Sequence, residues 1–140
     1  LEVVEFLLLC TACPFRRVAA AALDFWLCLQ DLALEDRHVA LGQPLYARLL
    51  DVLLAQCAYP PGGGFGEVDE DEWAAFRDGG QGARDVLVTC FYALGFEYID
   101  LLTARLTDPS TGWEAREAAL WALAAGAREA VATLAALDPR

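Results

Sequence analysis

The sequence predicts an all-α protein, an α-solenoid of about three antiparallel HEAT-type helix pairs covering residues 1–140. Apolar residues recur three and four positions apart through most of the chain, as they do on one face of a helix. No useful length of the chain alternates apolar and polar residues with the period of two that strands need. The first helices of the predicted pairs begin near residues 1, 44 and 96. The first step has the period of about 40–47 residues of two-helix HEAT repeats, and the longer second step includes an acidic loop as an insertion.

The first predicted pair covers residues 1–34. Its first helix, from Leu1 to Ala12, ends before Pro14, because proline lacks an amide donor and clashes with the preceding turn. The apolar face of that helix is predicted at Leu1, Val4, Leu8 and Ala12. The second helix, from about Arg16 to Leu34, carries its stripe at Val18, Ala22, Phe25, Leu29 and Leu32.

The second predicted pair covers residues 44–94. Pro44 lies in the first turn of its first helix, where proline is favoured, and that helix runs to about Ala58. The residues that it buries are predicted to be Leu45, Leu49, Val52 and Leu53. The second helix, Ala83 to Leu94, ends at Gly95, a common residue after a helix. Its apolar face is predicted at Ala83, Leu87, Cys90 and Leu94.

The third predicted pair covers residues 96–137. Its first helix, Phe96 to Leu106, stops before Asp108-Pro109. Thr111 and Glu114 have the spacing of a capping box, in which each side chain accepts a backbone N–H at the start of a helix. The apolar stripe of the final helix is predicted at Leu120, Ala124, Ala127, Val131 and Leu134.

A long acidic loop, residues 59–82, is predicted to interrupt the second pair. Pro60 and Pro61 end the preceding helix, four glycines follow within residues 62–66, and a short turn is expected at Trp73–Arg77. Five carboxylates crowd the middle of the loop, at Glu67, Asp69, Glu70, Asp71 and Glu72. Such a run prefers water, so the loop is either a solvated segment or a binding site for a basic partner.

Composition excludes several classes of protein. The net charge is −11 and the pI about 4.3, which argues against direct nucleic-acid binding and favours basic protein partners. Hydrophobic residues make up 57%, so we expect helices buried on more than one side, as in a piece of a longer protein that packs against neighbouring helices. The uncharged helical stretches, such as residues 86–96, are shorter than the roughly 20 residues of a membrane span, so no membrane insertion is expected.

No motif for catalysis, metal binding or a cofactor is recognised, and we expect the chain not to be an enzyme. Cys10 and Cys13 have redox or zinc spacing but no second cysteine pair, and are interpreted as two buried thiols. The odd number of cysteines, five, favours a reducing, intracellular compartment. His38 is interpreted as a solvated connection residue, and Asp24 as paired with an arginine of a neighbouring helix. The four tryptophans are expected to be packing anchors.

Several strings, in order along nearly the whole chain, resemble the importin-β-like karyopherins, and within them the transportin-SR and importin-thirteen branch. These strings are Asp24-Phe25-Trp26-Leu27-x-Leu29, Pro44-Leu45-Tyr46-x-Arg48-Leu49-Leu50, Glu72-Trp73-x-x-Phe76-Arg77, Arg84-Asp85-Val86-Leu87 and Trp113-Glu114. The glycine-rich stretches at 62–66 and 79–82 depart from the family's pattern.

The resemblance implies the central HEAT-repeat segment of a nuclear import receptor that shuttles between nucleus and cytoplasm. It implies binding of basic or arginine-serine-rich protein cargo, contact with phenylalanine-glycine nucleoporins and control by Ran-GTP. The acidic residues at 67–72 are then expected to contact Ran or basic cargo. The alternative from the residues alone is a HEAT-repeat scaffold subunit of another complex, since repeat solenoids offer extended binding surfaces.

Overall fold

The computed structural model describes residues 2–60 and 69–137, and within these ranges it is all-α, without a β-strand. The prediction of an all-α protein is confirmed. The described α-helices are α1 (Glu2–Thr11), α2 (Arg16–Leu29), α3 (Gln43–Cys57), α4 (Glu70–Asp78), α5 (Ala83–Leu94), α6 (Phe96–Thr107) and α7 (Trp113–Leu137). Two short 3-10 helices, η1 (Leu34–Asp36) and η2 (Val39–Leu41), connect α2 to α3.

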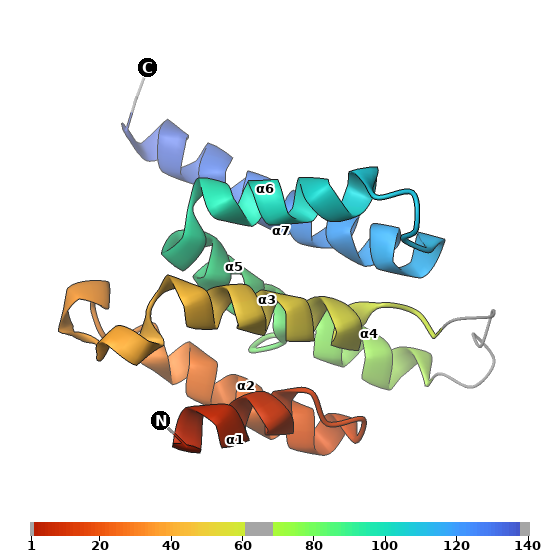
Figure 1. Cartoon of the computed structure of the whole chain (residues 1–140), viewed down its shortest axis with the longest axis horizontal. Coiled ribbons are helices and arrows are strands. Elements are labelled where there is room, and N and C mark those ends of the chain that lie inside the picture. Colours follow the sequence, from red (N-terminus) through yellow and green to blue (C-terminus); the bar gives the residue numbers. More distant parts are fainter. Residues whose placement is uncertain (1, 61–68, 138–140) are drawn as a thin grey trace.

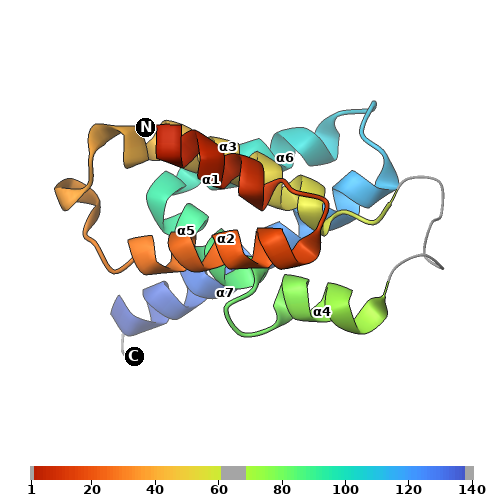
Figure 2. The same cartoon turned by 90° about the horizontal axis from the view of Figure 1, so that it is seen from below.

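The helices lie in two layers. Helices α1, α3 and α6 form one layer, and α2, α5 and α7 form the other (Figures 1 and 2). Consecutive members α1 and α2 pack together, as do α6 and α7, while α3 packs on α5. Helix α4 lies between α3 and α5 in the chain and sits on the outer side of the second layer, close to α2 (Figure 2).

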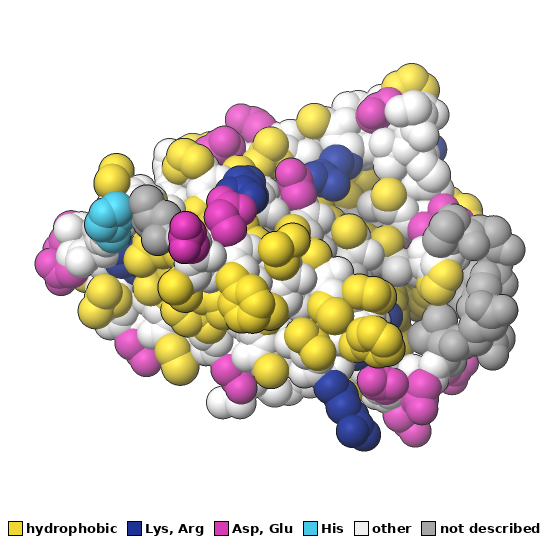
Figure 3. All heavy atoms as spheres, turned by 60° about the horizontal axis from the view of Figure 1, so that its bottom comes forward, with side chains coloured by type: hydrophobic (Ala, Val, Ile, Leu, Met, Phe, Trp, Pro, Cys, Tyr) yellow, Lys and Arg dark blue, Asp and Glu magenta, His cyan; other side chains and the backbone are white. Residues whose placement is uncertain are grey.

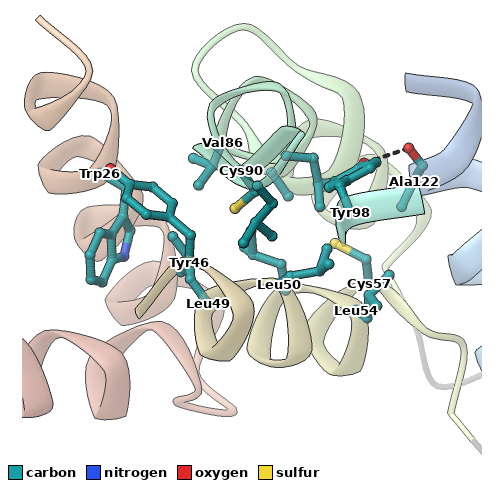
Figure 4. Close-up of a cluster of buried hydrophobic side chains, with 14 of the residues drawn as sticks. Trp26, Tyr46, Leu49, Leu50, Leu54, Cys57, Val86, Cys90, Tyr98 and Ala122 are labelled. Atoms are coloured by element: carbon teal, nitrogen blue, oxygen red, sulfur yellow. Dashed lines mark hydrogen bonds between the residues drawn. The ribbon is translucent and has the colours of Figure 1, made fainter. Parts of the chain in front are cut away.

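The core is formed where the two layers meet. Side chains from α2, α3, α5 and α6 converge there (Figure 4). The largest fully buried ones are Trp26, Tyr46 and Tyr98. Their polar atoms have partners, as buried polar groups require: Trp26 Nε1 donates to Thr11 Oγ1 at 2.9 Å, and the hydroxyl of Tyr98 donates to the carbonyl oxygen of Ala122 at 2.6 Å (Figure 4).

Helices α3 and α5 agree best with the sequence prediction. Pro44 lies in the first turn of α3, and α5 has the predicted bounds. All four residues predicted on the apolar face of α5 are buried. Gly95 follows α5 with a φ of 59°, a left-handed conformation that glycine adopts without the steric penalty of a Cβ.

Helix α2 ends earlier than predicted. It stops at Leu29, and the chain continues through turns instead of helix as far as Leu34. The buried residues of α2 are Ala19, Ala22, Leu23 and Trp26. Of the predicted stripe, Ala22 is buried and Phe25 and Leu29 pack partly buried against the core, whereas the prediction was wrong for Val18 and Leu32, which are exposed. Residues 30–33 are exposed, and a helical turn without a buried face gains little from packing.

The face of α7 was also predicted wrongly. Its buried residues include Ala118, Ala119, Ala122 and Ala125, whereas Leu120 and Val131 are 55% and 66% exposed. Small alanines allow α7 to approach its neighbours closely, and the larger leucine and valine point outward. The N-cap is Gly112, not Thr111, because the N–H of Arg116 donates to the carbonyl of Gly112 at 3.1 Å.

Helix α7 is, of the helices described, the one long and apolar enough by length and composition alone to cross a membrane. Glu70–Leu94 and Phe96–Thr107 pass the same test only as a pair bent by 115°. Arg128 and Glu129 lie well inside α7, where a bilayer would make charges costly. Of the apolar window of α7, 19% is buried inside the protein, and Ala118, Ala119 and Ala122 are among its buried residues.

Candidate functional site

The acidic residues predicted as a loop form the start of a helix. Glu67 lies outside the described residues. Asp69 is the N-cap of α4, and its Oδ1 accepts the backbone N–H groups of Asp71 and Glu72, both at 3.0 Å. Glu70, Asp71 and Glu72 make up the first turn. The prediction of a short turn at Trp73–Arg77 was therefore wrong, because the N-cap and the acidic first turn extend the helix toward its start.

Helix geometry explains why these acids favour a helix over a loop. The N-terminus of a helix carries a partial positive charge, which stabilises carboxylates in the first turn. The four described acids are exposed, and none makes an ion pair with another described residue. They therefore present four uncompensated negative charges on an ordered turn.

Aromatic and arginine side chains fix α4 to the rest of the protein. This aromatic–arginine cluster consists of Arg16, Tyr59, Trp73, Phe76, Arg77, Trp113 and Trp121. The ring of Tyr59 stacks on Trp73 with centroids 5.0 Å apart and on Trp113 with centroids 5.8 Å apart. The guanidinium of Arg16, at the start of α2, lies 4.6 Å from the Trp73 centroid, within cation–π range.

Arg77 is the most buried charge in the cluster. It is 4% exposed and donates through Nη2 to both carboxylate oxygens of Glu117 on α7, at 2.7 and 2.9 Å. Its guanidinium also lies 4.4 Å from the ring centroid of Trp121. The indole N–H of Trp121 donates to Asp78 at 2.9 Å, and Asp78 pairs with Arg84 at 2.6 Å. Two residues of α4 thus join it to α7. Arg77 contacts Glu117 and the ring of Trp121, and Asp78 accepts the indole N–H of Trp121.

Two adjoining grooves follow α2. The first, of about 570 Å³, lies between α2 and α4 and includes Arg16, Arg17 and Glu72 in its walls. The second, of about 690 Å³, continues past the start of α5 toward α7. Asp24 and Gln81 line both grooves, so the two adjoin there, and we call them together the α2 groove.

Four carboxylates surround the second part of the α2 groove, and no arginine does. They are Asp24, Asp31, Asp85 and Glu129. Asp85 accepts the backbone N–H of Gln81 at 2.9 Å, and Glu129 accepts the phenol of Tyr92. The side-chain carboxylates of Asp24 and Asp31 make no hydrogen bond or ion pair with any described residue. The prediction that Asp24 pairs with an arginine was wrong.

The cysteines give no sign of reactive chemistry. Cys57 and Cys90 are buried, Cys10 and Cys13 are partly buried, and Cys28 is exposed, so the interpretation of Cys10 and Cys13 as fully buried thiols was wrong. Burial raises the pKa of Cys57 to about 12, although Arg77 and Arg16 lower it, and burial also raises the pKa of Cys90. A neutral thiol is neither a nucleophile nor a metal ligand.

Two other sequence interpretations fall on described residues. His38 is exposed in the connection between α2 and α3, as predicted, and its Nδ1 accepts the N–H of Ala40 at 3.1 Å. Of the tryptophans, Trp26 and Trp73 are buried packing residues, whereas Trp113 is 49% exposed. Within the described ranges, no group of three or more histidine, cysteine or acidic side chains is placed to hold a metal.

No local pattern in the sequence indicates the α2 groove. Its acids are scattered over positions 24 to 129, and the packing of α2, α5 and α7 brings them to one groove. Asp24 lies on α2, whereas Asp31 lies in the turn that follows the helix.

No protein-family model matches the chain, and neither a curated protein nor a solved structure does. The functional assignment therefore depends on the geometry of this site and on the resemblance seen in the sequence.

Proposed function

We propose that the chain is the central segment of a nuclear import receptor of the importin-β-like class, and that it binds Ran or a basic cargo through its acidic turn. The observation that carries this proposal is the acidic turn, which consists of the N-cap Asp69 and the first-turn residues Glu70, Asp71 and Glu72 of α4. These four carboxylates are exposed and already ordered, so a basic partner meets them without the entropic cost of ordering a loop.

The solenoid arrangement is part of the same proposal. It is supported by the two-layer order of the helices, in which α1, α3 and α6 alternate along the chain with α2, α5 and α7 (Figure 1). Each pair packs on the next, as in repeat proteins whose units contact their neighbours. Helix α4 and residues 59–69 are then an insertion within the second pair.

Apolar side chains exposed at the α1 end support further stacking. Val3, Phe6 and Leu9 of α1 are between 63% and 70% exposed, and Phe15 is 75% exposed. Apolar side chains gather over the α1–α2 end of the molecule (Figure 3). In a solenoid such a face is covered by an adjacent helix pair, because an end repeat otherwise needs a polar outer surface.

The acidic turn would act mainly by steering its partner. Exposed ion pairs contribute only about 0.2–1 kcal/mol each. Several carboxylates on one helix end raise the rate of encounter with a basic surface and add weak contacts. Both effects diminish as salt shortens the range of the charges, to about 10 Å at 0.1 M.

A small apolar groove fits the expected contact with phenylalanine-glycine nucleoporins. It has a volume of about 400 Å³ and lies between the α1–α2 connection and α3, lined by Ala12, Pro14, Val52 and Ala55 among others. Such a groove suits a single aromatic side chain, whose burial contributes about 1.5–3 kcal/mol. We assign it to nucleoporin contact as part of the same proposal.

The test is binding of the complete polypeptide to Ran loaded with GTP or GDP, with and without an arginine-serine-rich peptide. The acidic-turn variant changes Glu67, Asp69, Glu70, Asp71 and Glu72 to the corresponding amides. Asparagine keeps the N-cap of α4, so the helix is preserved. The control variant Glu97→Gln with Asp100→Asn removes exposed charge from α6, in the other layer.

We expect GTP-selective binding that displaces the peptide and weakens in the acidic-turn variant but not in the control. Unchanged affinity of the acidic-turn variant at low salt would contradict the assignment of the turn. Failure of the unmodified polypeptide to bind either form of Ran would contradict the receptor, and would leave a scaffold subunit of another complex.

A further inference from the structure

We propose that the α2 groove binds an extended basic segment of a partner protein. The proposal rests on the proposed function, because it names where the basic cargo enters beyond the acidic turn. Glu72, the last acid of that turn, lines the first part of the groove, and Asp31 lies at the far end. A segment captured by the turn can therefore follow α2 through two adjoining grooves.

The groove has the length and the open floor that a peptide chain needs. Helix α2 has 14 residues, which at 1.5 Å each makes about 21 Å, the span of about six residues of extended chain. Small residues lie along the path, among them Ala20, Ala21 and Ala75. The two parts adjoin at Asp24 and Gln81, which line both of them.

The charges select and orient the segment. The part of the groove near α7 has four carboxylates and no arginine, whereas Arg16 and Arg17 lie at the α4 end. Asp24 and Asp31 have no partner among the described residues, so a guanidinium or ammonium group can pair with them without breaking an existing bond. Basic side chains of the segment are thus directed to the Asp24–Asp31 end.

Apolar residues between the acids suit the stems of long basic side chains. Leu27 of α2 and Val88 of α5 line the same part of the groove, and both are partly buried. Lysine and arginine pack their methylene groups on such surfaces while their charged ends reach acids or water. Nucleic acid, an anionic membrane and a second copy of this chain, with its net charge of −11, would instead be repelled.

The experiment measures binding of a dye-labelled hexaarginine peptide to the complete polypeptide by fluorescence anisotropy, at low and at high salt. The groove variant is Asp24→Asn with Asp31→Asn, and its matched control is Glu97→Gln with Asp100→Asn on α6. A second variant, Ala21→Arg, places a positive charge in the groove at an exposed helical position. Its matched control is Ala104→Arg, at an exposed position of α6.

We expect the groove variant to lose about 2- to 10-fold in affinity at low salt, from two weakened ion pairs. Ala21→Arg should weaken binding at least as much, and both α6 controls should stay within about 1.5-fold, the size of a general charge effect. Equal losses in the groove variant and its control would overturn the proposal, as would full binding by Ala21→Arg.

The two proposals can fail separately. Loss of peptide binding in the groove variant, in a polypeptide that ignores Ran, would support the groove and contradict the import receptor. Ran-GTP binding that depends on the acidic turn, with peptide binding unaffected by the groove variant, would contradict the groove alone.

Discussion

Arg77 of α4 and Glu117 of α7 form an ion pair whose two members differ in exposure. The Arg77 side chain is 5% exposed, whereas that of Glu117 is 38% exposed. The pair ties the helix carrying the acidic turn to the third helix pair, 40 residues further along the chain. The buried partner is the cation, so the consequences of removing each residue are unequal.

We expect Glu117→Gln to destabilise the protein more than Arg77→Met. The first change leaves a buried guanidinium without its counter-charge, and breaking a buried pair in this way costs about 3–5 kcal/mol, less what the amide oxygen recovers as an acceptor. The second change removes the buried charge and leaves Glu117 free to be hydrated. Methionine also keeps contact with Trp121, losing only the cation–π part, about 0.5–2 kcal/mol.

Urea unfolding of both single variants and the double variant measures this asymmetry. The free energy of unfolding of the double variant should be close to that of Arg77→Met, because Glu117 contributes little once its cationic partner is absent. Equal losses in the two single variants would show that water reaches Arg77 and that the pair is a surface contact.

Asp69 is expected to control the order of the acidic turn. Asp69→Ala removes the acceptor of two backbone N–H groups at the start of α4, and such a cap contributes about 0.5–2 kcal/mol. Because Trp73, Phe76 and Arg77 hold the rest of the helix, the loss should be local. Amide hydrogen exchange should accelerate at Asp71 and Glu72 and stay unchanged in α5.

Asp69→Asn is the matched control, because asparagine also accepts at the N-cap. Protection at Asp71 that is the same in Asp69→Ala as in the original protein would contradict the cap. Accelerated exchange throughout α5 would show that α4 and α5 open together.

Gly126 is expected to be required for the packing of α7 on α6. A Cβ at this position would lie 2.7 Å from Cε1 of Tyr98, a fully buried ring whose hydroxyl is bonded to Ala122. Alanine favours a helix by about 1 kcal/mol over glycine, and overpacking typically costs about 1–3 kcal/mol. We expect Gly126→Ala to lower the melting temperature despite its better helix propensity.

Gly80→Ala is the control, because a Cβ there meets nothing within 4 Å. Its melting temperature should be unchanged or slightly raised by the smaller entropy of the unfolded chain. A higher melting temperature in Gly126→Ala would contradict the close packing of Tyr98.

The all-α class and the positions of most helices could be predicted from the sequence, because proline and glycine mark most helix ends. Ala83 to Leu94 is bounded by Gly82 and Gly95, and its predicted face is the buried one. The face of α7 could not be predicted in the same way. This helix is rich in alanine, so periodicity does not distinguish the side that is buried from the side that is exposed.

The candidate site was predicted in part. The acidic run is evident from the composition of residues 67–72. It was predicted to be a loop, whereas Asp69 is the N-cap of a helix. The signal was present, since aspartate is a favoured N-cap and acids are favoured in a first turn. The α2 groove could not be predicted from any local sequence pattern, because tertiary packing brings Asp24 and Glu129 to the walls of one groove.

The two buried thiols predict how stability depends on alkaline pH. Burial raises the pKa of Cys57 to about 12 in the folded protein, against about 8.5 for an unfolded cysteine, and burial raises the pKa of Cys90 as well. The unfolded chain therefore releases protons that the folded protein keeps. The stabilisation is complete below about pH 8.5 and is lost as the pH rises toward 12, at up to about 1.4 kcal/mol per pH unit for each thiol.

Urea unfolding between pH 8 and pH 10.5 should show this decline in the free energy of unfolding. Cys57→Ala should reduce the slope of that free energy against pH by the contribution of one thiol. Slopes are compared instead of absolute stabilities, because the alanine variant also loses packing at every pH. Cys28→Ala, at an exposed thiol, should keep the original slope. An unchanged slope in Cys57→Ala would mean that water reaches Cys57 in the folded protein. The packing between the end of α3 and the aromatic–arginine cluster would then admit solvent.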